Sequence, residues 1–166
     1  LRRAKIEASI VLIRSPMPSQ AQRVVRAADL SLNTEIETIE LLSKFAVDLD
    51  VHHRIVLMVE LGDLREGFMP EEVDEALKRV LDLPHLHFAG IGTNLACRSG
   101  VIPDGANMGE LSRLADRLES DHSVSVDVVS GGNSANIDWL TSGSPIGRIN
   151  DLRLGESILL GQEPLH

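Results

Sequence analysis

The chain has 166 residues, 43% of them hydrophobic, and carries a formal net charge of −9 at pH 7. This length allows one domain with a substantial core, and the acidic balance argues against a nucleic-acid surface, which needs clustered Lys and Arg. We expect no membrane span, because no apolar run is long enough, and no secretory signal. The single cysteine, Cys97, excludes a disulfide framework and a thiolate metal cluster. We therefore expect a cytoplasmic protein without a metal site.

Segments of strand type and helix type alternate along the chain. The first half predicts, in order, a strand over 8–14, a helix over 20–28, a strand over 30–33, a helix from Thr34, a strand over 54–60 and a helix from Pro70. The second half predicts a strand over 87–94, a helix over 109–120, a strand over 124–129, a short helix from about Asn136 and a last strand over 152–160.

This alternation recurs about six times and predicts a parallel α/β fold with right-handed crossovers. An open doubly wound sheet and a (β/α)₈ barrel both satisfy the pattern. The motif G-x-G-x-x-G does not follow the first strand, which weakens the dinucleotide-binding version. Polar residues follow nearly every predicted strand, as expected at the mouth of a barrel: Asn33, Glu60, Arg65, Asn94, Ser134 and Arg153. We therefore predict a TIM-type (β/α)₈ barrel, present as about six βα units.

Two glycine-containing turns carry the strongest ligand signal in the chain. Each turn, over 128–134 and 151–157, runs from an apolar segment into small residues and a hydroxyl. Glycines let the backbone approach a ligand, and free N–H groups beside Ser134 can hold an anion. Two such turns on successive strands, with Arg153 just before the second glycine, predict a phosphate-binding site at one end of the sheet.

Four segments, over 58–67, 90–97, 129–134 and 152–161, carry a family resemblance. The chain resembles the N-terminal barrel domain of the alanine racemase family, most closely its ornithine racemase-like branch. That family binds pyridoxal 5′-phosphate (PLP), so the resemblance implies a racemase that interconverts L- and D-amino acids by α-proton abstraction. It also implies a homodimeric full-length protein, of which residues 1–166 form the central and C-terminal part of the barrel domain. The first two strands and any second domain would lie outside this chain.

The resemblance assigns most of the cofactor site to the two turns. Ser134, with backbone N–H groups near Asn133, Gly155 and Glu156, would bind the cofactor phosphate. Arg153 falls where the family places an arginine against the pyridine nitrogen. An arginine keeps its proton at working pH and so leaves that nitrogen unprotonated, which makes the ring a weaker electron sink.

Two further catalytic candidates, besides Arg153, are implied in the same way. Arg65 falls where the family has an arginine near the cofactor's phenolic oxygen and the substrate carboxylate, and a guanidinium fork suits a carboxylate. Asn94 stands where alanine racemases usually carry a histidine beside the ring. Met58 replaces a lysine and Glu60 replaces an aspartate. These departures argue against alanine as the substrate.

The charge of the predicted barrel mouth suggests a different substrate. Three acidic residues there could receive the distal ammonium group of ornithine or lysine: Asp63, Glu66 and Glu156. The Schiff-base lysine of the family lies on the first barrel strand, and Lys5, Lys44 and Lys78 lie in helical, surface-like contexts that do not match that motif. We therefore expect this chain by itself to be inactive, and the full-length protein to be an enzyme.

Two other functions fit the same residues. One is a carrier that resembles the pyridoxal-phosphate homeostasis proteins, which use this barrel without established racemase activity. The other is a barrel that binds a different phosphorylated metabolite. At single positions, Glu60 is either catalytic or a partner of Arg65 or of backbone groups, and Arg153 is either a cofactor ligand or a structural ion-pair partner. Asn33 is expected to cap the helix that follows it.

Overall fold

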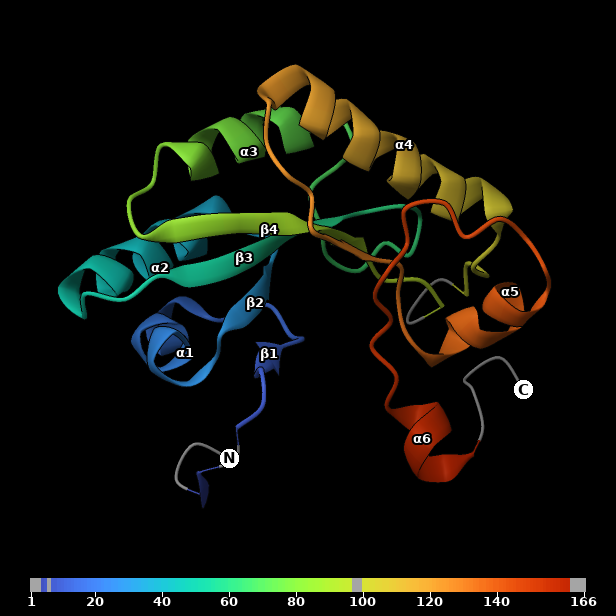
Figure 1. Ribbon diagram of the computed structural model, residues 1–166, viewed down its shortest axis with the longest axis horizontal. Helices are drawn as coiled ribbons and strands as arrows, with labels where there is room; N and C mark the ends of the chain where they lie inside the picture. The colour runs from blue at the N-terminus through green and yellow to red at the C-terminus, as the bar shows by residue number, and fades with distance from the viewer. Residues whose placement is uncertain (1–3, 6, 97–99, 162–166) are drawn as a thin grey trace.

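The computed structural model describes residues 4–5, 7–96 and 100–161, and its centre is a five-stranded parallel sheet (Figure 1). The strands lie side by side in chain order, and the sheet curls into half of a barrel. They are β1 (Val11–Leu12), β2 (Leu30–Asn33), β3 (His53–Val59), β4 (Leu86–Thr93) and β5 (Val128–Ser130). Because parallel neighbours need a crossover connection, a helix follows each of the first four strands.

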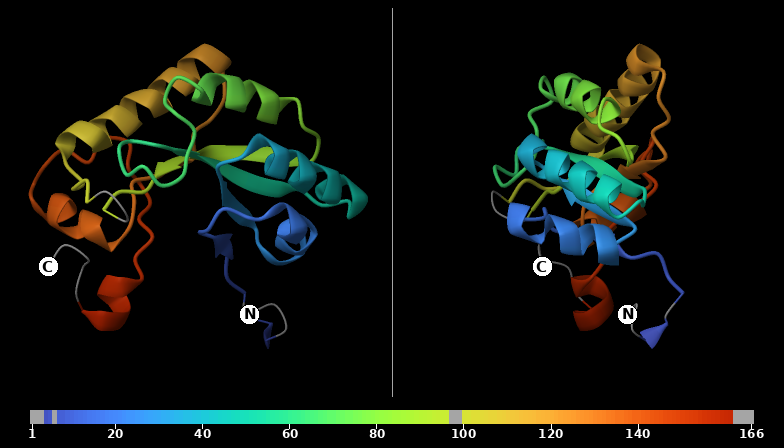
Figure 2. Two further views of the ribbon diagram at one scale, coloured as in Figure 1. Left: turned by 180° about the vertical axis from the view of Figure 1, so that it is seen from behind. Right: turned by 90° about the vertical axis from the view of Figure 1, so that its left-hand side faces the viewer.

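Helices cover the outer, convex face of this half-barrel (Figure 2). They are α1 (Ala21–Ala27, preceded by the 3₁₀ turn η2, Pro18–Gln20), α2 (Ile36–Asp48), α3 (Val73–Leu81) and α4 (Gly105–His122). The chain after β5 forms the 3₁₀ turn η3 (Ser134–Asn136) and the short helices α5 (Ile137–Thr141) and α6 (Glu156–Leu160). These last helices lie on the side toward which β3 and β4 point (Figure 1).

The core lies mainly between the sheet and its outer helices. Along β3, Ile55, Leu57 and Val59 pack into the large cluster that also contains the buried residues of α1 to α4. The alternate residues Val56 and Met58 face the inner side of the half-barrel, in a smaller cluster with residues of β2 and β4. Side chains alternate between the two faces of a strand, so one continuous apolar run serves both clusters.

Most predicted elements are confirmed, with shifted ends. The strands predicted over 30–33, 54–60 and 87–94 correspond to β2, β3 and β4. The helix predicted over 109–120 is longer, because Asp104 caps its start. The Asp104 carboxylate accepts from the N–H groups of Ala106 and Asn107, at 2.8 and 2.9 Å. The short helix expected near Asn136 is present as η3 and α5.

The last predicted strand, over 152–160, is wrong. Only Asp151 pairs with the sheet, through an isolated bridge to Ser130, and Glu156–Leu160 forms α6. Gly155 is the N-cap of that helix, and the acid Glu156 lies in its first turn, where the helix dipole favours it. The sheet therefore has five strands among the described residues, and the predicted count of about six βα units is not established.

The outer strands are also shorter than predicted. Of the strand predicted over 8–14, only Val11–Leu12 forms β1. In place of the strand predicted over 124–129, the structure has the shorter β5, Val128–Ser130. Just before β5, the N–H of Val126 donates to the Glu119 carboxylate at 2.9 Å. A side chain therefore holds the backbone here, in place of hydrogen bonds to a neighbouring strand. Among the described residues, no helix is long and apolar enough to cross a membrane.

Candidate cofactor site

The two glycine-containing turns lie against each other at the carboxyl end of β5. Ser130 and Asp151 form the isolated bridge, and the N–H of Arg153 donates to the carbonyl oxygen of Gly132 at 2.9 Å. Further along, the N–H of Ser157 donates to the Ser134 hydroxyl at 3.1 Å. The structure thus brings together the two segments in which the sequence predicted a phosphate site.

The first turn has a backbone that requires glycine. Gly132 has a φ of +141°, and a Cβ built on it would lie 2.2 Å from Oδ1 of Asn136. The fully buried Asn136 amide fixes this turn by donating to the Gly131 carbonyl at 3.0 Å and accepting from the Asn133 N–H at 3.0 Å. The Asn133 side chain in turn donates to the carbonyl of Leu95 at 2.9 Å. Asn133 therefore braces the turn against the end of β4.

Hydroxyl groups gather between the two turns. Ser134 is 2% exposed, and its hydroxyl lies 3.2 Å from that of Ser157. At Gly155 a Cβ would meet no atom within 4 Å, so the backbone there is open to a close approach. Two rotatable hydroxyls beside an open glycine backbone fit a phosphate group. The hydroxyl that ends the second turn was noted in the sequence, but Ser157 was given no role beside Ser134.

Arg153 and Asn94, two of the predicted catalytic residues, are in direct contact. The Arg153 guanidinium donates to the Asn94 side-chain oxygen and to the Thr93 carbonyl, both at 2.6 Å. Its other terminal nitrogen donates to the hydroxyl of Ser130, which donates to the carboxylate of Asp151. These bonds tie the guanidinium to the ends of β4 and β5. Thr93, Ser130 and Asp151 were not predicted, because the sequence does not reveal which strand ends meet.

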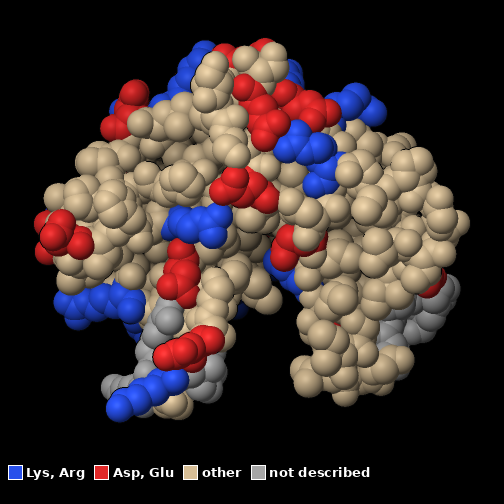
Figure 3. All heavy atoms as spheres, in the orientation of Figure 1, with Lys and Arg blue, Asp and Glu red and all other residues tan. Residues whose placement is uncertain are grey.

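Arg153 lines a cavity of about 510 Å³ on the inner face of the half-barrel. Its wall combines three residues of the site segment with apolar residues in or next to the strands. The first are Asp151, Arg153 and Gly155, and the second include Val11, Ile13, Leu30, Leu32 and Val128. Figure 3 shows the molecule hollowed along its lower edge, between the amino-terminal segment and the segment that leads to α6. A flat heterocycle, with apolar faces and polar groups on its edge, fits such a wall.

Arg65 lies apart from this cluster. Its side chain is 36% exposed and pairs with Glu66 at 3.1 Å, and its described contacts do not link it to Arg153. The neighbouring Glu60 carboxylate accepts from the backbone N–H groups of Gly62, Leu64 and Arg65, at 2.5, 3.0 and 3.2 Å. Of the two roles open for Glu60, the structure shows the one that holds this loop.

The structure also bears on the expectations for Asn33, for the acidic residues of the predicted barrel mouth and for Cys97. Asn33 does not cap α2. Its amide donates to the Ser31 carbonyl at 2.7 Å, and the N-cap residue of that helix is Glu35. The expected ammonium acceptor Asp63 is fully buried, whereas Glu156 is exposed. Cys97 lies outside the described residues, among which no group of three or more His, Cys, Asp or Glu could hold a metal ion.

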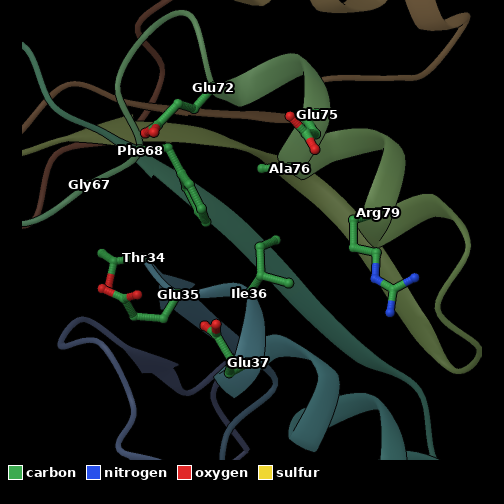
Figure 4. Close-up of a pocket in the computed structure, with 10 residues that line it drawn as sticks. All are labelled: Thr34, Glu35, Ile36, Glu37, Gly67, Phe68, Glu72, Glu75, Ala76 and Arg79. Atoms are coloured by element: carbon green, nitrogen blue, oxygen red, sulfur yellow. The ribbon is translucent and has the colours of Figure 1, made fainter.

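A second cavity, of about 620 Å³, lies between α2 and α3 (Figure 4). Phe68 points into this cavity. The rim carries four glutamates, which are Glu35, Glu37, Glu72 and Glu75. It opens on the helix side of the sheet and contains none of the predicted site residues. Its acidic rim does not suit a phosphate, so the inner cavity beside Arg153 is the better candidate.

The chain matches one protein family and two characterised relatives. The family described as alanine racemase, N-terminal domain, matches residues 1–163. The ornithine racemase of Acetoanaerobium sticklandii is 41% identical over 154 residues, which are 92% of this chain and 44% of that protein. The lysine racemase of Thermotoga maritima is 30% identical over 163 residues, which are 98% of this chain and 45% of that protein. The chain therefore spans somewhat less than half the length of these relatives.

Solved structures of low sequence identity share the fold. PipY of Synechococcus elongatus, without PLP, matches with a TM-score of 0.76 at 16% identity, over 95% of this chain and 74% of that one. A structure of the same protein with PLP bound also gives 0.76. An alanine racemase of Clostridium difficile matches with a TM-score of 0.76 at 18% identity, over 93% of this chain and 40% of that one.

Proposed function

This chain belongs to the alanine racemase N-terminal domain family, and from that membership we propose that the protein is a PLP-dependent racemase of ornithine or lysine. One observation carries the proposal. The Arg153 guanidinium and the Ser134 hydroxyl lie on two segments that pair with each other at the carboxyl end of β5. A fixed cation near a group of neutral hydroxyl donors matches the two ends of a phosphorylated pyridine ring.

The phosphate end of the site would be formed by Ser134, Ser157 and the backbone N–H groups of Gly155 and Glu156. Both hydroxyls are neutral donors that can rotate toward an anion, and glycine lets the backbone approach it. Asn133 would contribute indirectly, because its side chain holds the first turn against Leu95.

The ring end would be formed by Arg153, held by Asn94 and the Thr93 carbonyl. A guanidinium keeps its proton at working pH, so the ring nitrogen that it contacts stays unprotonated. When bound, PLP would supply a moderate electron sink for the negative charge that develops at the substrate α-carbon. Asn94 would act on the ring only through Arg153.

The substrate would be recognised by charged groups around the cavity. Arg65, in its exposed loop, would bind the α-carboxylate, because a guanidinium fork matches a carboxylate. The names of the two relatives, an ornithine racemase and a lysine racemase, support a substrate with a distal ammonium group. Of the acids considered, Glu66 and Glu156 remain accessible for that group.

The test uses the full-length protein. PLP is titrated while the absorbance of the bound cofactor is followed, and the enantiomers formed from L-ornithine, L-lysine and L-alanine are separated by chiral chromatography. We expect saturable PLP binding and racemisation of a basic amino acid in preference to alanine. Arg153→Ala and Ser134→Ala should each weaken PLP binding about tenfold, through loss of a charge-assisted hydrogen bond.

Arg79→Ala is the matched control, because it removes an arginine that pairs with Glu40 on the outer helices. It should leave PLP affinity unchanged. If the full-length protein does not bind PLP, the proposal is wrong, and a barrel for another phosphorylated metabolite becomes the better reading. If it binds PLP without racemising any of the three amino acids, a carrier function is favoured, as the fold shared with PipY would allow.

A further inference from the structure

A chain of hydrogen bonds links Arg153 to a carboxylate that the family resemblance does not assign. The guanidinium donates to the Ser130 hydroxyl, and that hydroxyl donates to Oδ2 of Asp151. The other acceptors described for this guanidinium, the Thr93 carbonyl and the Asn94 side-chain oxygen, are neutral. In this chain of contacts, Asp151 is the negatively charged group, and it reaches Arg153 through the Ser130 hydroxyl.

The backbone fixes both members of this link. Ser130 is the last residue of β5 and is fully buried, and Asp151 is its bridge partner. The N–H of Gly131 donates to the Asp151 carbonyl at 2.9 Å, which sets the position of the aspartate. Gly92 leaves room for the serine, because a Cβ on Gly92 would lie 3.0 Å from the Ser130 Cβ. The contact is therefore built into the sheet.

A hydroxyl that donates to a carboxylate becomes a stronger acceptor, because the negative charge polarises its O–H bond. The Ser130 oxygen should then hold the guanidinium more firmly than a serine without that partner. The carboxylate also offsets part of the positive charge that Arg153 presents to the cavity, since both residues line it.

From these contacts we propose that Asp151, acting through Ser130, is a positioning residue that fixes Arg153 and tunes its charge at the cofactor site. This inference rests on the proposed function, because it concerns how tightly and in which protonation state PLP is held. Asp151 itself touches neither cofactor nor substrate in this scheme. It acts on them through the serine and the arginine.

The opposite end of β5 offers a matched control. There, Ser125 donates to Asp127 at 2.7 Å, and Arg54 pairs with the same carboxylate at 3.4 Å. The residue types are those of the Arg153 cluster, and Arg54 lines the same cavity. This pair lies at the amino ends of its strands, and its described contacts do not reach Arg153. Asp127→Asn therefore removes the same charge without touching the proposed link.

The experiment compares full-length protein carrying Asp151→Asn, Ser130→Ala, both changes, or Asp127→Asn. The probe is PLP, and the readouts are its dissociation constant, the pH midpoint of the absorbance change of the bound cofactor, and the melting temperature without PLP. Ser130→Ala removes a charge-assisted hydrogen bond, and Asp151→Asn keeps the contact but removes its charge, so each should weaken PLP binding about tenfold. The double variant should bind no more weakly than Ser130→Ala, since the carboxylate acts through the hydroxyl.

The pH midpoint separates an electrostatic role from a merely structural one. Asparagine can still accept the serine hydrogen bond, so Asp151→Asn removes the charge and keeps the contact. Loss of a nearby negative charge disfavours the protonated state of the cofactor group whose titration changes the absorbance. The pH midpoint of that change should therefore move to lower pH. Asp127→Asn should leave the midpoint and the PLP affinity at their wild-type values.

Two results would overturn the inference: wild-type affinity and midpoint in Asp151→Asn, or losses that simply add in the double variant. Because Asp151 is exposed, its asparagine variant decides the question even if Ser130→Ala lowers the melting temperature. A wild-type protein that binds no PLP would instead refute the proposed function, so the two failures are distinguishable.

Discussion

The sheet and the cofactor-site segment of this half-barrel are held by different forces. In β3, the five residues Ile55–Val59 are all buried, and the contacts that hold them are apolar on both faces. The segment over 130–157 is held in addition by bonds from side chains to backbone carbonyls. Asn133 bonds to Leu95, Asn136 to Gly131 and Arg153 to Thr93. Damage to the sheet should therefore lower the stability of the whole chain, and damage to the segment should be felt mainly in ligand binding.

The largest loss of stability is expected from a cavity in the sheet. Leu57 is fully buried between β3 and the outer helices. Leu57→Ala should lower the free energy of unfolding by about 3 kcal/mol, from lost burial and an unfilled cavity, as measured by urea denaturation. Leu159→Ala is the control, because Leu159 is 83% exposed. A similar loss in both variants would contradict the view that the sheet core carries the stability.

A change in the first turn should affect ligand binding more than the stability of the chain. In Gly132→Ala, the added methyl group would meet the Asn136 amide, and the φ of +141° is strained for alanine. We expect PLP affinity of the full-length protein to fall at least about tenfold, because the turn that carries Ser134 must shift to relieve this contact. Gly105→Ala, at a helix start where a Cβ meets nothing within 4 Å, should bind PLP normally. Normal binding by Gly132→Ala would show that the turn does not need its present shape.

The same contrast explains what could be predicted from the sequence. A buried strand such as β3 is visible in its composition, because burial on both faces demands a continuous run of apolar residues. The Gly131-Gly132-Asn133-Ser134 turn was also visible in its residue types, and its pairing with a second such turn led to the prediction of an anion site. These elements need no knowledge of distant partners.

Features that depend on distant partners were missed. Nothing in the sequence around Ser130 reveals that its hydroxyl meets Asp151, or that Thr93 offers its carbonyl to an arginine 60 residues later. The apolar run Ile158–Leu160 suggested a strand, yet its side chains are 65–83% exposed in α6. Periodicity measures whether residues can be buried, and only the assembled fold decides whether they are.

A smaller effect is expected from a buried polar group within the sheet itself. His53, at the start of β3, is 1% exposed, and its Nε2 lies 2.9 Å from the Ser31 hydroxyl. Burial lowers the pKa of His53 below its ordinary value of 6.5, although a bond to the Ala28 backbone and the charge of Asp29 oppose this shift. Below pH 6.5 the unfolded chain therefore binds a proton that the folded chain does not.

Stability should fall as the pH drops below 6.5, by at most about 1.4 kcal/mol per pH unit from this residue. His53→Gln should flatten that dependence in urea denaturation series between about pH 7 and pH 5.5. His87→Gln, which changes an exposed histidine of β4, should keep the wild-type slope. An unchanged slope in His53→Gln would mean that another group causes the pH dependence.

The smallest effect is expected where the site segment is tied to the outer helices. The Arg148 guanidinium donates to Glu119 at 3.0 Å and to Asp116 at 2.6 Å, both on α4, and the Val126 N–H bonds to the same glutamate. The bonds from Arg148, and then that from Val126, lower the pKa of Glu119 from 4.5 to about 2. A lowered carboxylate pKa adds stability above pH 4.5, and this stability is lost as the pH falls toward 2.

Arg148→Gln should therefore lower the melting temperature slightly at neutral pH and by less as the pH falls toward 2, where Glu119 of the wild-type protein begins to take up its proton. The side chains of Arg148 and Glu119 are each 33% exposed, so high salt should reduce the difference. Arg79→Gln, which breaks the more exposed pair with Glu40, should change the melting temperature less. If Arg148→Gln also weakened PLP binding, the segment would depend on its outer attachment as well as on its inner hydrogen bonds, and the two regions would be coupled more tightly than their separate contacts indicate.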